Sequence, residues 1–164
     1  MSVNKASGQA LANGGSLDDV LAHAPALHAR YKAFVESWWQ DGTLSRRLLE
    51  LVRLRIGLIH GQDLSDQKRD PEVALSAAEE QDLIAARFDN FPPQERVALE
   101  AAEHIPFDHH GLSDAQVHAL SEHLGHRGAV ALLIAAAFFD VNCRLNLVWA
   151  VPSTPGTYQP GQLA

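Results

Sequence analysis

The chain has 164 residues, the size of a single domain, with 46% hydrophobic residues, 20% charged residues and a formal net charge of -7. This negative balance, with no basic cluster beyond Arg46 and Arg47, argues against nucleic acid as a partner, because phosphate binding needs a basic face. The single cysteine, Cys143, excludes an intramolecular disulfide, a dithiol redox cycle and a cysteine-based zinc site.

The two ends of the chain differ in composition from the middle. Residues 1–15 contain one lysine and no apolar segment typical of a secretory signal, so we predict a flexible N-terminal arm. Residues 152–164 lack core-forming side chains, and we expect this tail to hang free or to lie over a neighbouring subunit. Residues 16–151 then form the one domain. Its longest apolar run, 129–139, is too short to span a bilayer, so we expect a soluble, cytoplasmic protein without a membrane partner.

Helix signals recur along the chain, whereas no segment alternates apolar and polar residues as a half-buried strand does. The N-terminal signals are Ser16, Pro25, the box Ser76-x-x-Glu79, the pair Pro92-Pro93 and the box Ser113-x-x-Gln116. We therefore predict an all-α fold, with helices beginning at 16 and over 25–40, 44–60, 62–75, 76–88, 94–104, 113–124 and 128–150.

Several of these helices have apolar faces that must pack against another helix or another subunit. In the second, the residues expected to form a buried stripe are Leu27, Tyr31, Phe34, Val35 and Trp38. The helix 44–60 and the first half of the helix 128–150 are apolar on nearly every side, so each is buried or shared between subunits. So much apolar helix in so short a chain predicts a homo-oligomer.

Three segments, taken together in this order, resemble one family. The stretch 44–70 (LSRRLLELVRLRIGLIHGQDLSDQKRD), the stretch 75–84 (LSAAEEQDLI) and the stretch 94–151 are similar to the alkylhydroperoxidase D-like, carboxymuconolactone decarboxylase family. The resemblance covers about 44–151. It implies an all-helical bundle that assembles into trimers, hexamers or dimers, without a cofactor, acting on hydroperoxides in the redox branch or on a lactone acid in the decarboxylase branch.

The redox residues of that family are replaced in this chain. Its motif Asn-Gly-Cys-x-x-Cys-x-x-x-His falls on His60 and Gly61, with Gln62 and Ser65 at the two cysteine positions and Arg69 at the histidine position. Peroxide reduction needs a thiolate and a resolving thiol, which amide and hydroxyl groups do not provide. The resemblance therefore implies a member without dithiol peroxidase chemistry.

The retained residue of the motif is Glu50, twelve positions before Gln62, which resembles the family's proton-relay glutamate. On an apolar helix its carboxylate either pairs with Arg46, Arg47 or Arg53, or transfers protons. His60 is either a general base, since imidazole titrates near neutral pH, or a histidine that caps a carbonyl.

The other polar residues near His60 could bind a substrate. We expect Gln62, Ser65 and Arg69 at the start of a helix, where free N–H groups favour an anion, and Arg53 completes the predicted binding set. Ser65 is equally an N-cap residue.

The remaining polar and aromatic residues are interpreted structurally. We assign no metal, and read His104, Asp108, His109 and His110 as a connecting loop, because their spacing matches no known metal signature. Asn142 and Arg144 resemble an Asn-Arg pair of the family and are expected to tie the last helix to a neighbour. The remaining aromatic residues assigned to the core or an interface are Trp38, Trp39 and Trp149.

These residues lead to three functional hypotheses. The first is a cofactor-free acid/base enzyme, of lyase, decarboxylase or isomerase type, in which Glu50 and His60 act on a small organic acid, lactone or carbonyl compound. The second is a catalytically silent binding or scaffold protein of the same fold. The third is a peroxidase-related protein with residual activity through Cys143.

Overall fold

A computed structural model describes residues 15–152 and 155–158 and is mostly helical, which confirms the all-α prediction. The predicted N-terminal arm lies almost entirely outside these residues. In chain order the elements are α2 (Leu17–Leu21), α3 (Pro25–Gln40), α4 (Arg46–Ile59), the 3-10 helix η1 (Leu64–Asp66), β1 (Lys68–Arg69), α5 (Ala77–Ile84), α6 (Pro93–His104), the 3-10 helix η2 (His109–Gly111), α7 (Asp114–Val148) and β2 (Gly156–Thr157).

Local capping chemistry sets most helix starts. The side chains of Ser16, Ser76 and Ser113 each accept a backbone N–H three residues later, and each closes a reciprocal capping box. The two helices predicted on either side of Gly125 form the single element α7, which changes direction at Gly125, where φ is 71°.

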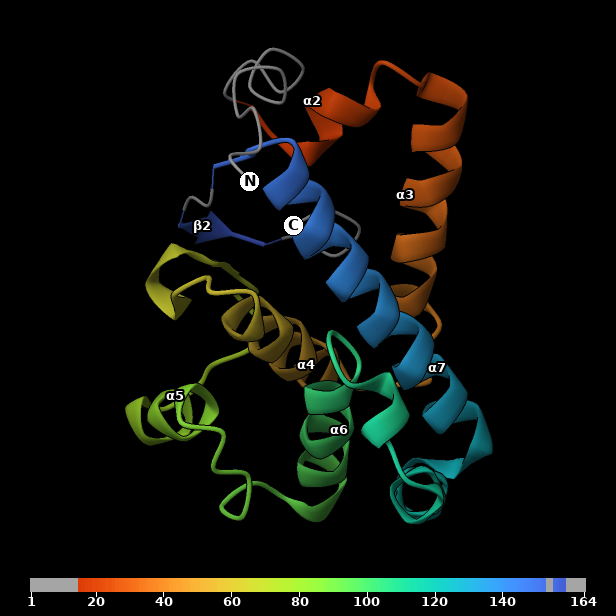
Figure 1. Ribbon diagram of the computed structural model, residues 1–164, viewed down its shortest axis with the longest axis vertical. Helices are drawn as coiled ribbons and strands as arrows, with labels where there is room; N and C mark the ends of the chain where they lie inside the picture. Colours follow the sequence, from red (N-terminus) through yellow and green to blue (C-terminus); the bar gives the residue numbers. More distant parts are fainter. Residues whose placement is uncertain (1–14, 153–154, 159–164) are drawn as a thin grey trace.

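The helix α4 forms the centre of the fold. Seven of its residues, from Leu48 to Ile56, are exposed by 3% or less, because α6 and α7 pack against it and α5 covers part of its remaining surface. Figure 1 shows α7 crossing the molecule between α3 and the pair formed by α4 and α6. The nearly all-round apolar character of α4 is thus explained within one chain.

Two sequence-based expectations about local structure are wrong. Residues 62–75, all of which the structure describes, contain no α-helix: Gly61 adopts φ 79°, and η1 and β1 follow. Polar groups in this stretch form hydrogen bonds with neighbouring elements, and its backbone does not form α-helical turns. The stripe on α3 is also not buried as a whole, since only Val35 is fully covered, while Leu27 and Phe34 are 60% and 41% exposed.

The C-terminal segment also differs from the prediction. Residues Gly156 and Thr157 pair in parallel with Lys68 and Arg69, forming a small two-stranded sheet. Tyr158 is 1% exposed and is packed within its own chain. The expectation that this tail contributes nothing to the core is therefore wrong at Tyr158.

The helix α7 is long and apolar enough, by length and composition, to cross a membrane. Its contacts with α4 and α6 give another reason for this composition, because 44% of the apolar window is buried inside the fold. A central helix of a helical domain meets the same criterion.

Gly57 allows the loop after α4 to return close to the helix. A Cβ atom at this position would lie 2.5 Å from Oε1 of Gln67. The Gln67 amide instead lies flat against α4 and donates to the carbonyls of Leu54 and Gln62, at 3.2 and 3.1 Å. The missing side chain thus fixes the path of the loop.

We predict that Gly57→Ala lowers the free energy of unfolding by about 1–3 kcal/mol, because the displaced Gln67 amide loses its buried hydrogen bonds. Urea denaturation measures this change. In a Gln67→Ala background the same substitution is expected to be neutral or to stabilise by up to about 1 kcal/mol, as alanine does in an open helix position. Equal losses in both backgrounds would show that Gln67 is not the cause.

Candidate functional site

The predicted site residues fall into two groups along α4. Glu50 and Arg53 lie in the middle of the helix, whereas His60 is its C-cap residue. Glu50 and His60 are ten residues apart, which corresponds to about 15 Å along a helix axis. The structure therefore does not place these two side chains together, and a direct proton exchange between them is not feasible.

Glu50 and Arg53 form a buried ion pair. The guanidinium donates from Nε and Nη2 to the two carboxylate oxygens, at 2.8 Å each, with the side chains 1% and 6% exposed. The backbone N–H of Asp70 donates a third bond to Glu50, at 3.0 Å. Of the three arginines considered as partners for Glu50, Arg53 is the one that pairs with it.

The neighbouring arginines have other partners. Arg46 pairs with Asp70, whose side chain is fully buried, and Arg47 bonds to Glu79 and Glu95. The hydrogen bond that Arg46 donates to the Asp70 carboxylate raises the pKa of Arg46. Because Asp70 also bonds to Glu50 through its backbone, the charges of α4 and of the loop after it form one connected network.

His60 belongs to a second polar cluster, centred on Asp140 of α7. Its Nε2 atom lies 2.7 Å from Oδ1 of Asp140, and its side chain is 3% exposed. Asp140 also accepts two bonds from Nε of Arg144, at 3.0 and 2.9 Å. The ring of Phe107 covers His60, with centroids 5.2 Å apart. Nε2 of His60 thus contacts a carboxylate, whereas the capping interpretation, one of the two considered, placed a carbonyl there.

Sequence reasoning missed Asp140 as a partner of His60. The two residues are 80 positions apart. Asp140 follows the longest apolar run of the chain, and an isolated carboxylate after such a run needs a cationic or donor partner. That signal indicated a buried pair but could not identify its second member.

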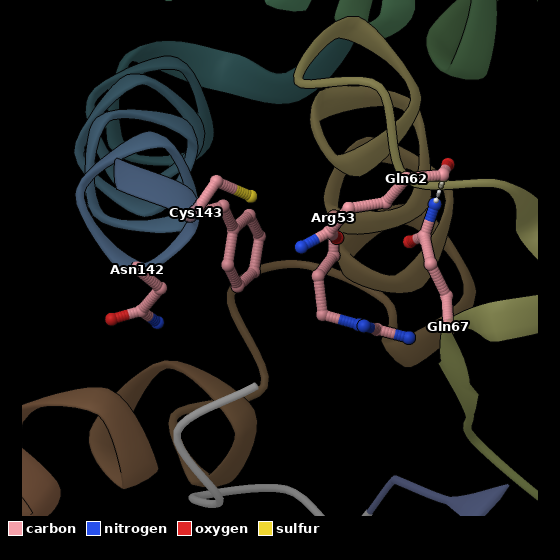
Figure 2. Close-up of a pocket in the computed structure, with 6 residues that line it drawn as sticks. Arg53, Gln62, Gln67, Asn142 and Cys143 are labelled. Carbon is pink, nitrogen blue, oxygen red and sulfur yellow. Dashed lines mark hydrogen bonds between the residues drawn. The ribbon is translucent and has the colours of Figure 1, made fainter. Parts of the chain in front are cut away.

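A small pocket lies between α4 and α7. Its lining residues are Arg53, Gln62, Gln67, Phe139, Asn142 and Cys143. Figure 2 shows Cys143 on α7 facing Arg53, Gln62 and Gln67 across this space. The enclosed volume is about 20 Å³, which holds about one water molecule. At this volume the pocket is too small for an organic substrate.

The thiol of Cys143 points into this pocket but is not an activated nucleophile. Burial is the largest cause that raises its pKa to about 12, and the Asp140 carboxylate acts in the same direction. A cysteine becomes reactive when its pKa is lowered by cations or a helix N-terminus. Cys143 therefore has the character of a core residue.

The other predicted binding residues lie away from the pocket. Ser65 is exposed and lies inside η1, whose N-cap residue is Asp63, so the N-cap expectation for Ser65 is wrong. Arg69 lies in β1 and pairs with Glu80 at 2.7 Å. Since no α-helix follows Gln62 directly, the predicted anion site at a helix N-terminus does not exist there.

The remaining predictions concern the histidine loop, the tryptophans and the end of α7. No group of three or more metal-ligating side chains occurs among the described residues. Trp38 packs against Phe138 and Phe139. Within this chain, Asn142 accepts a bond from Tyr31, and Arg144 also donates to the carbonyl of Pro106.

No protein-family model matches the chain, and neither a curated protein nor a solved structure shows significant similarity to it.

We predict that Cys143 resists alkylation. With a pKa of about 12 in place of the ordinary 9.0, its thiolate fraction at pH 8 falls about 1,000-fold. Iodoacetamide labelling, followed by mass spectrometry, should be slower in the native protein than in urea by at least that factor. Equal labelling rates in the two states would show an accessible, ionisable thiol and would revive the peroxidase hypothesis.

Proposed function

We propose that this protein is a divergent, thiol-independent member of the alkylhydroperoxidase D-like, carboxymuconolactone decarboxylase family, and that it is a cofactor-free acid/base enzyme for a small organic acid, lactone or carbonyl compound. The observation that carries the proposal is a carboxylate-oriented histidine, His60, two residues from Gln62, which lines a small pocket together with the buried guanidinium of Arg53. Buried titratable groups of this kind cluster at functional sites.

The pocket and the histidine share two chain segments. His60 is two residues from Gln62, and Asp140 directly follows Phe139; both Gln62 and Phe139 line the pocket. When Nε2 of His60 donates to Asp140, the other ring nitrogen, Nδ1, is the one that can accept a proton and act as the base. Nδ1 takes a proton from the carbon next to a carbonyl group and returns it to the product.

The negative charge of that reaction develops on the carbonyl oxygen. Arg53 and the Gln62 amide are the donors of the pocket that stabilise it, because both line the enclosed space. Glu50 holds the guanidinium in place through two hydrogen bonds, so its role is to position Arg53. Arg69, which pairs with Glu80, has no part in this scheme.

A ligand screen provides the first test. Thermal shift against small acids, lactones and carbonyl compounds should identify a ligand that raises the Tm of the protein by mass action. We expect Gln62→Ala to abolish that rise, because it removes a donor at the pocket. His118→Gln, a change at a histidine that is 75% exposed in α7, should leave it intact.

Turnover of the ligand identified in this way provides the second test. We predict that His60→Gln lowers kcat by about 10²- to 10⁴-fold, the usual contribution of a general base. His118→Gln should keep full activity. Unchanged turnover in His60→Gln would contradict the assignment of the base.

A catalytically silent binding or scaffold role is the second candidate. Two observations favour it: Glu50 already accepts three hydrogen bonds from the protein, and the pocket has space for only about one water molecule. A screen with no ligand that raises the Tm would favour this candidate.

Self-association is part of the proposal, and its support is an exposed apolar seam on α7. The seam residues follow a spacing of four, three, four and seven positions: Val130, Ile134, Ala137, Val141 and Val148. Val130, Ile134 and Val148 are 59%, 40% and 65% exposed. The average spacing is 3.6 residues, so these side chains lie along one face of the helix, and an exposed apolar face of this kind suits packing against a second helix.

We predict that the protein is a homo-oligomer and that Ile134→Lys dissociates it, because a charge in the seam would be buried without a partner. Light scattering after size exclusion measures the mass. Val117→Lys, at a residue of similar exposure before the bend in α7, should not change the assembly. A wild-type mass of 17.9 kDa would contradict this part of the proposal.

A further inference from the structure

The segment 155–158 covers α4 but is held by few interactions. Its backbone forms the two-residue ladder with β1, and Tyr158 donates its N–H to the carbonyl of Arg69, at 2.7 Å. Gly156 and Thr157 are exposed, so the burial of the segment is concentrated in the Tyr158 ring. A segment of this kind opens locally at low cost compared with unfolding of the core.

The surface beneath the ring is charged. The Arg53 guanidinium lies 4.2 Å from the centroid of the Tyr158 ring, a cation–π contact, and the ring of Trp39 lies 5.4 Å away. Glu50 and Asp70, each 1% exposed, complete the network around Arg53. The aromatic ring therefore closes a compartment of paired charges.

Tyr158 and the pocket lie against the same guanidinium. Arg53 lines the pocket that holds about one water molecule, and it also stacks on Tyr158. The Tyr158 ring thus fills a space beside Arg53 of the size that an organic ring needs. Opening of the segment would make that space available.

We propose that Tyr158 occupies a binding site for a small para-substituted phenol, and that such a ligand enters by displacing the segment 155–158. The side chain itself defines the ligand chemistry: a π face for Arg53, a ring tilted against Trp39, and a hydroxyl group that tolerates burial. The inference rests on the proposed function, because Arg53 binds the ligand in both. It adds a phenol ring to the ligand, with the acid, lactone or carbonyl group of the substrate as the para substituent, and it adds the route of entry.

The direct test uses the wild-type protein and p-cresol, which is the side chain of tyrosine as a free molecule. Hydrogen exchange with mass spectrometry follows the amides of Gly156, Thr157 and Tyr158. Binding of p-cresol should speed their exchange at least about threefold, because bound ligand increases the population of the open form. The matched probe, 4-methylcyclohexanol, has the same polar group without a π face and should have no effect.

Two variants separate competition from binding. Tyr158→Ala removes the internal competitor, so its Kd for p-cresol in calorimetry should be at least about 10-fold lower than that of the wild type. Tyr158→Phe keeps the ring on Arg53 and should bind p-cresol about as the wild type does. The exchange measurement on the wild type keeps the test valid if Tyr158→Ala does not fold.

Three outcomes would overturn the inference. In the first, p-cresol binds Tyr158→Ala but leaves hydrogen exchange in the wild type unchanged, even at the highest soluble concentration. Tyr158 would then be a permanent part of the core. Equal binding of both probes would indicate an apolar cavity without recognition of the aromatic face. Binding of p-cresol that slows exchange in 155–158 would place the ligand elsewhere. None of these readouts involves turnover, so the two proposals can fail separately. If p-cresol opens the segment 155–158 while His60→Gln keeps normal turnover, the proposed function is rejected and the phenol site is not.

Discussion

The buried ion pair between Glu50 and Arg53 sets the arrangement of polar groups around the middle of the central helix. Two charged groups exposed by 1% and 6% remain there only because each hydrogen bond of the pair is made and the loop after α4 supplies further partners. The position of that loop follows from this requirement: the Lys68 carbonyl and the Asp70 N–H must reach α4, and Gly57 leaves room for Gln67 to pack beside them. The ring of Tyr158 then covers the side of the Arg53 guanidinium that these groups leave open.

The same network separates two kinds of polar site. Around Arg53 the charges are balanced and enclosed, which suits binding and positioning. Around His60 a carboxylate orients an imidazole at the end of the helix, which suits proton transfer. The pocket between α4 and α7 contains Arg53, and the thiol of Cys143, whose pKa is raised by burial, forms part of its wall.

The sequence was sufficient where local chemistry decides the structure. Ser76 and Ser113 predicted helix starts because a capping box is complete within four residues. It also restricted the partner of Glu50 to three arginines, because helical spacing limits the choice. It failed where distant segments decide: the pairing of β1 with β2, the burial of Tyr158 and the contact of His60 with Asp140 join residues more than 75 positions apart. It also predicted a helix over 62–75, where bonds to α4 hold the chain in an irregular path.

The measurement that tests this account most directly compares stability and ligand response in the double variant Glu50→Leu, Arg53→Met. If the pair serves binding, its apolar replacement should keep the free energy of unfolding within about 2 kcal/mol of the wild type or raise it, as is common for buried pairs. The same variant should lose the ligand-induced rise in Tm completely. A variant that retains that rise, or that unfolds because the pair itself holds the fold together, would contradict the account.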